Sequence, residues 1–183
     1  VRNSVFTQIF APGEAPTTNN MSEHIWGRTH TSDGHFIIEN HVFGHITRHN
    51  DAIDVDGSTR PGPVIQILDK TYLGGVDDEL DPDGDAHTEG HHFMHIRKDQ
   101  FNTGAGNANG ISAGDGHDYV MVRNTFIDVD HAAQVKEGAF MTFVNNTVVD
   151  VAHSALYFLR PGGTVHGSGA YLDGNIFENV PVV

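Results

Sequence analysis

The densest group of charged side chains lies in residues 74–92, where seven acidic residues and three histidines occupy nineteen positions. Aspartates two residues apart, here Asp81, Asp83 and Asp85, are typical of loops that bind Ca²⁺ through carboxylate oxygens. The EF-hand template nevertheless fails, because the position that requires glycine is Ala86. The stretch therefore indicates cation binding, but whether its carboxylates can share an ion depends on the strands and turns that position them.

Composition excludes several classes of function. The 183-residue chain has 24 acidic residues against 10 lysines and arginines, a formal net charge of −14. Binding to nucleic acid needs clustered basic side chains, so we expect no nucleic-acid partner. No apolar run approaches the length of about eighteen residues that a membrane-spanning helix needs, so we expect no membrane insertion. The absence of cysteine excludes disulfides, zinc–thiolate sites and cysteine nucleophiles.

A short pattern recurs along the chain: alternating apolar residues, a polar pair, and an aromatic or β-branched anchor. The anchors are Phe6, Phe43, Tyr72, Phe101, Phe126, Val148 and Phe177. Period-2 alternation punctuated by Gly, Asn and Asp predicts short strands and turns, with almost no helix. An Asn shortly before the anchor, as at Asn124 and Asn146, fits a turn in which its side chain satisfies backbone groups. We therefore predict an all-β fold, a right-handed parallel β-helix (a solenoid) of about six to seven coils.

The repeat also defines the expected domain organisation. Residues 1–183 form a single β-helix domain with insertions at 11–34 and 102–109, the first of which contains the only Trp. Both ends of the sequence resemble the middle of a repeat, so we expect a fragment of a longer chain. Uncapped ends of a solenoid favour end-to-end self-association.

A second strand is expected about ten residues after each anchor. Its copies lie at 51–57, 78–84, 109–116, 132–138 and 154–162. Alternation directs Asp54 and Asp56 outward from one copy, and Asp81 and Asp83 outward from the next. Neighbouring strands lie about 4.8 Å apart, so these four residues should form a ladder of carboxylates.

Stacked carboxylates cannot all stay ionised without compensation, because like charges about 5 Å apart repel by roughly 1 to 3 kcal/mol per pair near a protein surface. Either some pKa values rise or a cation bridges the ladder. Oxygen-only ligands favour Ca²⁺, and the candidate ligands are Asp54, Asp56, Asp78, Asp81, Asp83 and Asp85. The alternative is a solvated acidic face that keeps the solenoid soluble.

Other outward positions on the same face are candidates for binding or catalysis. Ser112, Gln134 and Tyr157 are expected to contact a ligand. Lys136 and Arg160, about one coil apart, could perform β-elimination on a uronic-acid polymer, with Lys136 taking the C5 proton and Arg160 assisting the leaving oxygen. The alternative is that Lys136 pairs with Glu137 or with the ladder.

The fourteen histidines include two closely spaced groups. These groups are His41, His45 and His49, and His91, His92 and His95. Because a strand does not cluster side chains at these spacings, we expect scattered surface histidines, and a metal site across coils remains an open alternative.

The chain from His35 onward resembles a known group of proteins. The resemblance rests on "HFIIENHVFGHITRHNDAIDVDG", "RPGPVIQIL", "LGGVDDELDPDGDAHTEG", "HAAQVKEGAFMTFVNNTVVDVA" and "AYLDGNIFENV". They are similar to β-helical segments of large secreted bacterial proteins that also carry lamin-tail and spore-coat-kinase-like domains. Pro82 within a strand and His91–His92 in place of a turn Asn depart from that pattern. The run from Lys136 to Arg160 is more loosely similar to alginate-lyase and chondroitinase-B-type β-helix lyases, although Pro161-Gly162 replaces the His-Gly that follows the Arg there.

These resemblances imply an extracellular or cell-surface bacterial protein. We expect a carbohydrate-directed β-helix module that binds a polysaccharide or cell-surface glycan and carries an acidic face suited to Ca²⁺. The alternatives are a calcium-dependent polysaccharide lyase and a structural spacer or filament-forming segment of a surface protein.

Overall fold

The computed structural model describes residues 1–7, 23–28, 36–46, 51–57, 59–61, 64–75, 77–97, 108–159 and 167–183. These residues contain strands and turns and no helix, and all the strand pairings found among them are parallel. The predicted all-β class is therefore confirmed. Most of both predicted insertions lies outside the described ranges. Within those ranges, no helix is long and apolar enough to cross a membrane.

The strands follow one another in a regular order. They are β1 (Arg2–Phe6), β2 (Ile25–Arg28), β3 (Phe36–Phe43), β4 (Ile53–Asp56), β5 (Ile65–Tyr72), β6 (Leu80–Asp83), β7 (Ala86–Glu89), β8 (His92–Ile96), β9 (Asn109–Ala113), β10 (Asp118–Val122), β11 (Thr125–Val129), β12 (His131–Val135), β13 (Phe140–Val144), β14 (Thr147–Val149), β15 (Ser154–Phe158), β16 (Gly169–Asp173) and β17 (Ile176–Glu178).

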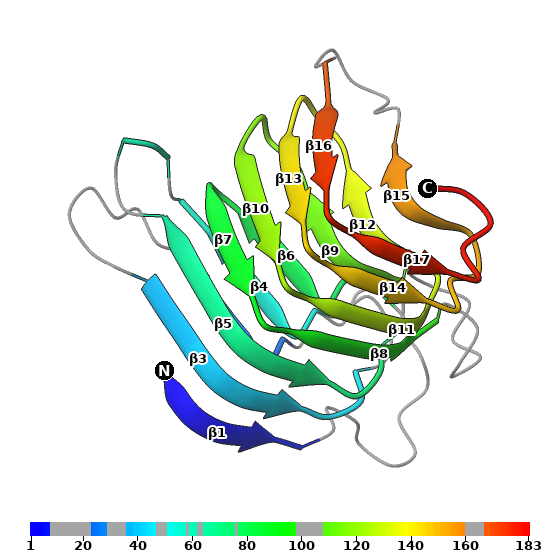
Figure 1. The fold of residues 1–183 in the computed structure, drawn as a ribbon. Helices are drawn as coiled ribbons and strands as arrows, with labels where there is room; N and C mark the ends of the chain where they lie inside the picture. Colours follow the sequence, from blue (N-terminus) through cyan, green and yellow to red (C-terminus); the bar gives the residue numbers. More distant parts are fainter. Residues whose placement is uncertain are drawn as a thin grey trace, which may run out of the picture.

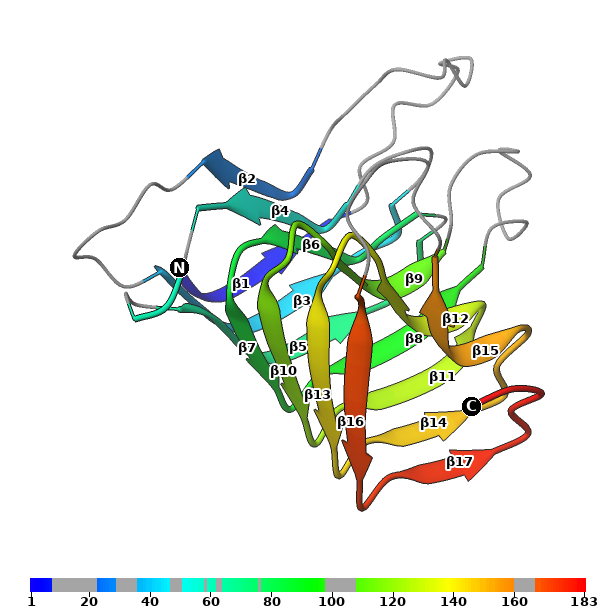
Figure 2. The same ribbon diagram turned by 90° about the horizontal axis from the view of Figure 1, so that it is seen from above.

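Two curled sheets enclose the core (Figures 1 and 2). The larger has eleven strands, with the central path β16-β13-β10-β7-β5-β8-β11-β14-β17, and β3 and β1 extending from β5. The smaller has six strands in the order β15-β12-β9-β6-β4-β2. Strands of successive repeats lie side by side, so β10, β11 and β12 stack on β13, β14 and β15. This arrangement is consistent with the β-solenoid class.

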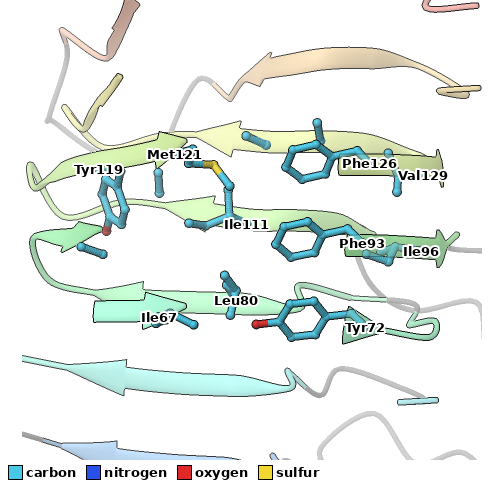
Figure 3. Close-up of a cluster of buried hydrophobic side chains, with 14 of the residues drawn as sticks. Ile67, Tyr72, Leu80, Phe93, Ile96, Ile111, Tyr119, Met121, Phe126 and Val129 are labelled. Carbon is cyan, nitrogen blue, oxygen red and sulfur yellow. The ribbon is translucent and has the colours of Figure 1, made fainter. Parts of the chain in front are cut away.

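A column of aromatic rings forms the centre of the core. Phe43, Tyr72, Phe93 and Phe126 occupy paired positions in successive repeats, and their neighbouring ring centroids are 4.6 to 5.2 Å apart. Figure 3 shows the rings of Tyr72, Phe93 and Phe126 lying one above another. The predicted anchors are confirmed except for Phe101, which lies outside the described residues. The paired residue is Phe93, because β8 begins directly after the turn at residues 90–91.

A second column, of polar side chains, lies two residues before the anchors. Asn146 accepts a hydrogen bond from the backbone N–H of Asn124 at 2.9 Å, and Asn175 accepts one from the N–H of Asn146 at 2.8 Å. The prediction that these asparagines satisfy backbone groups is confirmed, but the left-handed conformation also expected of them is adopted by the residue before each. Each repeat bends here, at a residue with positive φ; these residues are Asn3, Asn40, Asp69, Gly90, Arg123, Asn145 and Gly174.

Candidate functional site: the outer face of the six-stranded sheet

The predicted carboxylate ladder lies on the outer face of the six-stranded sheet. The pairing of β4 with β6 places Asp54 beside Asp81 and Asp56 beside Asp83, as the sequence indicated. The alternate residues are buried and hold the register; Ile53 pairs with Leu80 in the core. Apolar packing beneath the sheet therefore sets the geometry of this face, and it holds the acidic side chains close to one another.

One row of side chains crosses the whole face. Trp26 pairs with Asp54, Asp54 with Asp81, and Gln134 with both Ser112 and Tyr157. Asp81 and Ser112 are also neighbours in this row, because the residues that precede them, Leu80 and Ile111, are paired. The order across the sheet is thus Trp26, Asp54, Asp81, Ser112, Gln134 and Tyr157. An exposed aromatic side chain marks each end, Trp26 at 61% and Tyr157 at 39% exposure.

Tyr157 is held in place by its neighbours on the sheet. Its ring stacks on the imidazole of His131, with centroids 4.8 Å apart and planes 17° apart. His131 in turn is fixed by a 2.8 Å hydrogen bond between its Nδ1 and the Ser154 hydroxyl. A flat platform of two rings therefore lies at this end of the face. Trp26, at the other end, was not predicted as a site residue. Its position between Ile25 and Gly27 in the first insertion was the signal in the sequence that could have indicated an outward-facing side chain on a strand.

Ser112 and Gln134 were expected to be open to a ligand, and this expectation is wrong. Ser112 is 0% exposed and Gln134 is 1% exposed. Both lie on central strands of the sheet, where their side chains are buried although they do not point into the core. Of the three predicted ligand-contacting residues, only Tyr157 is exposed.

The acidic end of the face is crowded and partly buried. Asp78 is buried, and burial together with the nearby Asp77 carboxylate raises its pKa to about 7 against the opposing effect of a 2.6 Å hydrogen bond from the Asn109 amide. Burial also raises the pKa of Asp51 and Asp81, and Asp78 adds to both shifts. The shifts remain upward even though the ammonium group of Lys136 acts to lower the pKa of Asp78 and Asp81.

Two groups of three carboxylates have oxygens close enough to share an ion. The first is Glu23, Asp51 and Asp54, and the second is Asp51, Asp77 and Asp78; within each group the oxygens lie within 4.8 Å of one another. Asp51 belongs to both. The sequence did not identify Glu23 as a ligand, because it lies in the first insertion. Asp77 belongs to the acidic stretch at residues 74–92 but was not predicted as a ligand. The pairing of Ile25 with Ile53 brings Glu23 beside Asp51, since each lies two residues earlier.

Asp85 has a different role from the one predicted for it. Its carboxylate accepts backbone N–H groups from Arg60 at 2.6 Å and Asp118 at 2.8 Å, and His117 Nδ1 lies 3.4 Å away. Burial acts to raise its pKa, but these hydrogen bonds and the nearby positive charges lower it overall. Asp85 therefore fixes the turn that enters β7 and lies outside both carboxylate groups.

Lys136 extends over the acidic end of the face. Burial acts to lower its pKa, but the carboxylates of Asp81, Asp78, Glu137 and Asp83 raise it overall. The amine is therefore protonated at neutral pH, which opposes its predicted use as the base of an elimination reaction. Arg160, the second predicted catalytic residue, lies outside the described residues.

The expectation that the histidines are surface residues is wrong for two of them. His41 is 2% exposed and His91 is 0% exposed, and both lie in the interior polar column. Their Nδ1 atoms accept backbone N–H groups, from Ser4 at 2.9 Å and from Lys70 at 3.1 Å respectively. A histidine can thus replace the turn asparagine because its Nδ1 is an acceptor at the right distance from the backbone.

Comparison of the chain with models of protein families, with curated proteins and with solved structures finds no match.

Proposed function

We propose that the chain is a right-handed parallel β-helix of about six to seven coils that recognises a glycan with the outer face of its six-stranded sheet. Parallel strands joined by crossovers are right-handed in nearly all proteins, which supports the handedness. The observation that carries the function is the row with exposed Trp26 at one end and Tyr157 at the other. A glycan ligand suits an extracellular or bacterial cell-surface location.

The row offers the two kinds of contact that sugars use. Aromatic rings with one exposed side can pack against the C–H faces of sugar rings, and carboxylates accept hydrogen bonds from hydroxyl groups. Trp26 and Tyr157 are separated by five strand spacings, or about 24 Å. A ligand that contacts both must be an extended chain of several sugar units that runs across the strands.

Affinity measurements on a panel of alginate, pectate and neutral glucans test this proposal. Trp26→Ala and Tyr157→Ala are each expected to weaken binding by about three- to tenfold, because each removes one stacking contact. Tyr171→Ala is the matched control, since Tyr171 is 54% exposed but lies on β16 of the other sheet. Binding that is absent, or that weakens equally in all three variants, would contradict glycan recognition by this face.

The same assay separates the alternatives. A lyase would generate the ultraviolet absorbance of unsaturated uronates from alginate or pectate, which the protonated state of Lys136 leads us not to expect. End-to-end association without glycan binding would instead indicate a structural spacer.

A further inference from the structure

Five carboxylates, those of Asp51 and four acidic neighbours, form a junction where β2, β4 and β6 begin. Glu23, Asp51 and Asp54 share one set of neighbouring oxygens, and Asp51, Asp77 and Asp78 share the other, each within 4.8 Å. These residues lie in three successive repeats that are far apart in sequence. Only the stacking of the repeats brings them together.

An acidic cluster alone does not identify a ligand, but the buried side chain of Asn109 contacts this one. Asn109 is 0% exposed and its side-chain oxygen has no hydrogen-bond partner, while its amide nitrogen donates to Asp78 at 2.6 Å. A buried carbonyl oxygen without a partner is costly. Calcium binds six to eight oxygens and commonly combines carboxylates with amide carbonyls, so Asn109 supplies the complementary kind of ligand.

The position of Lys136 explains why the junction, and not the centre of the ladder, is the place for a cation. The ammonium group acts on Asp81 and Asp83, which lie outside both carboxylate groups, as well as on Asp78. The main electrostatic influences on Asp51 are four carboxylates, Asp78, Asp81, Asp77 and Asp54. The ammonium group of Lys136 thus compensates the carboxylates of Asp81 and Asp83, whereas the main charges that act on Asp51 are all negative.

We propose that Glu23, Asp51, Asp54, Asp77 and Asp78 form a Ca²⁺ site bordered by the side chain of Asn109, and that Lys136 acts as the permanent counter-ion for the rest of the ladder. The site differs from the one expected from sequence, since Asp51 is central and Asp56, Asp81, Asp83 and Asp85 are not ligands. It does not depend on glycan binding.

The chain offers a direct readout for this site. Trp26, the only tryptophan, pairs with Asp54 and so lies next to the proposed ion. Terbium binds calcium sites and emits when a nearby indole transfers energy to it. Excitation of Trp26 in the presence of Tb³⁺ should therefore give sensitised emission, and added Ca²⁺ should abolish it by displacement. Trp26→Phe controls for the origin of the signal.

Two matched substitutions locate the ion. Asp51→Asn removes the carboxylate common to both groups and should weaken Tb³⁺ and Ca²⁺ binding by at least about tenfold. Asp83→Asn, on the same face but outside both groups, should leave binding within about twofold of the unchanged protein. Circular dichroism in chelator checks that both variants fold; if Asp51→Asn does not, Glu23→Gln takes its place.

Three results would overturn the proposal. They are the absence of Trp26-sensitised emission, emission unchanged by Asp51→Asn, and loss of binding in Asp83→Asn equal to that in Asp51→Asn. Glycan affinity measured in chelator is independent of all three, so failure of the cation site and failure of glycan recognition are distinguishable.

Discussion

Lys70 interrupts the interior polar column. It is 1% exposed and lies between His41 and His91, and its protonated amine cannot accept a hydrogen bond as an asparagine would. Burial lowers the Lys70 pKa from 10.5 to about 7 against the opposing charges of Asp69 and Glu39. The cost of the buried charge is therefore fully present below about pH 7 and declines as pH rises toward the unfolded value.

We accordingly expect Lys70→Asn to raise the free energy of unfolding by about 1 to 3 kcal/mol near pH 6, with a smaller gain near pH 9. Denaturant titrations at the two pH values measure it. Lys136→Asn is the control and should have the opposite sign, because Lys136 neutralises Asp81 and Asp78. Destabilisation by Lys70→Asn near pH 6 would show that the lysine contributes more than it costs.

At the scale of the strands, the close approach of β9 to the aromatic column depends on one glycine. A Cβ added at Gly110 would lie 2.6 Å from the Phe126 ring and 2.7 Å from the Ala132 carbonyl oxygen. Neither neighbour can move freely, since Phe126 is buried in the ring stack and the carbonyl belongs to the backbone. Gly110→Ala should therefore destabilise the fold by about 1 to 3 kcal/mol through overpacking.

Gly27→Ala is the matched control on β2 of the same sheet, because a Cβ there would meet nothing within 4 Å. It should change the free energy of unfolding by less than about 0.5 kcal/mol. Thermal melts of the two variants give the comparison. Equal effects would mean that backbone entropy, and not contact with the ring stack, determines the outcome.

For the whole molecule, buried acids should set the dependence of stability on pH. Burial raises the pKa of Asp78 to about 7 and that of Glu79 to about 8, with neighbouring carboxylates adding to both. A raised folded pKa means that stability is undiminished below about pH 4 and is lost as pH rises toward 8. His91 has the opposite effect at acidic pH. Burial lowers its pKa to about 3, so its contribution to stability is lost as pH drops below about 6.5.

We therefore expect the melting temperature in chelator to be lower near pH 8 than near pH 6, even though Lys70 opposes this trend above pH 7. Ca²⁺ should reduce the difference, because it favours ionised carboxylates. Glu79→Gln, which removes one of the buried acids, should flatten the profile between pH 6 and 8. A melting temperature that rises steadily from pH 6 to 8 would contradict this assignment.

Several features follow from the sequence because they depend on local order alone. Alternation within a strand directs Asp54 and Asp56 to the face opposite Ile53, and the repeat pairs them with Asp81 and Asp83. The turn asparagines are equally local, since each lies two residues before its anchor. Strands of four or five residues with a single buried face leave little freedom in register.

Other features were decided only by the tertiary structure. Loops of unequal length conceal which residues become neighbours, so Phe93 replaced Phe101 as an anchor and Glu23 joined Asp51 without any signal in the spacing. Burial was also beyond the sequence: Ser112 and Gln134 face away from the core and are nevertheless covered. Alternation fixes the direction of a side chain, but its exposure depends on the tertiary structure around it.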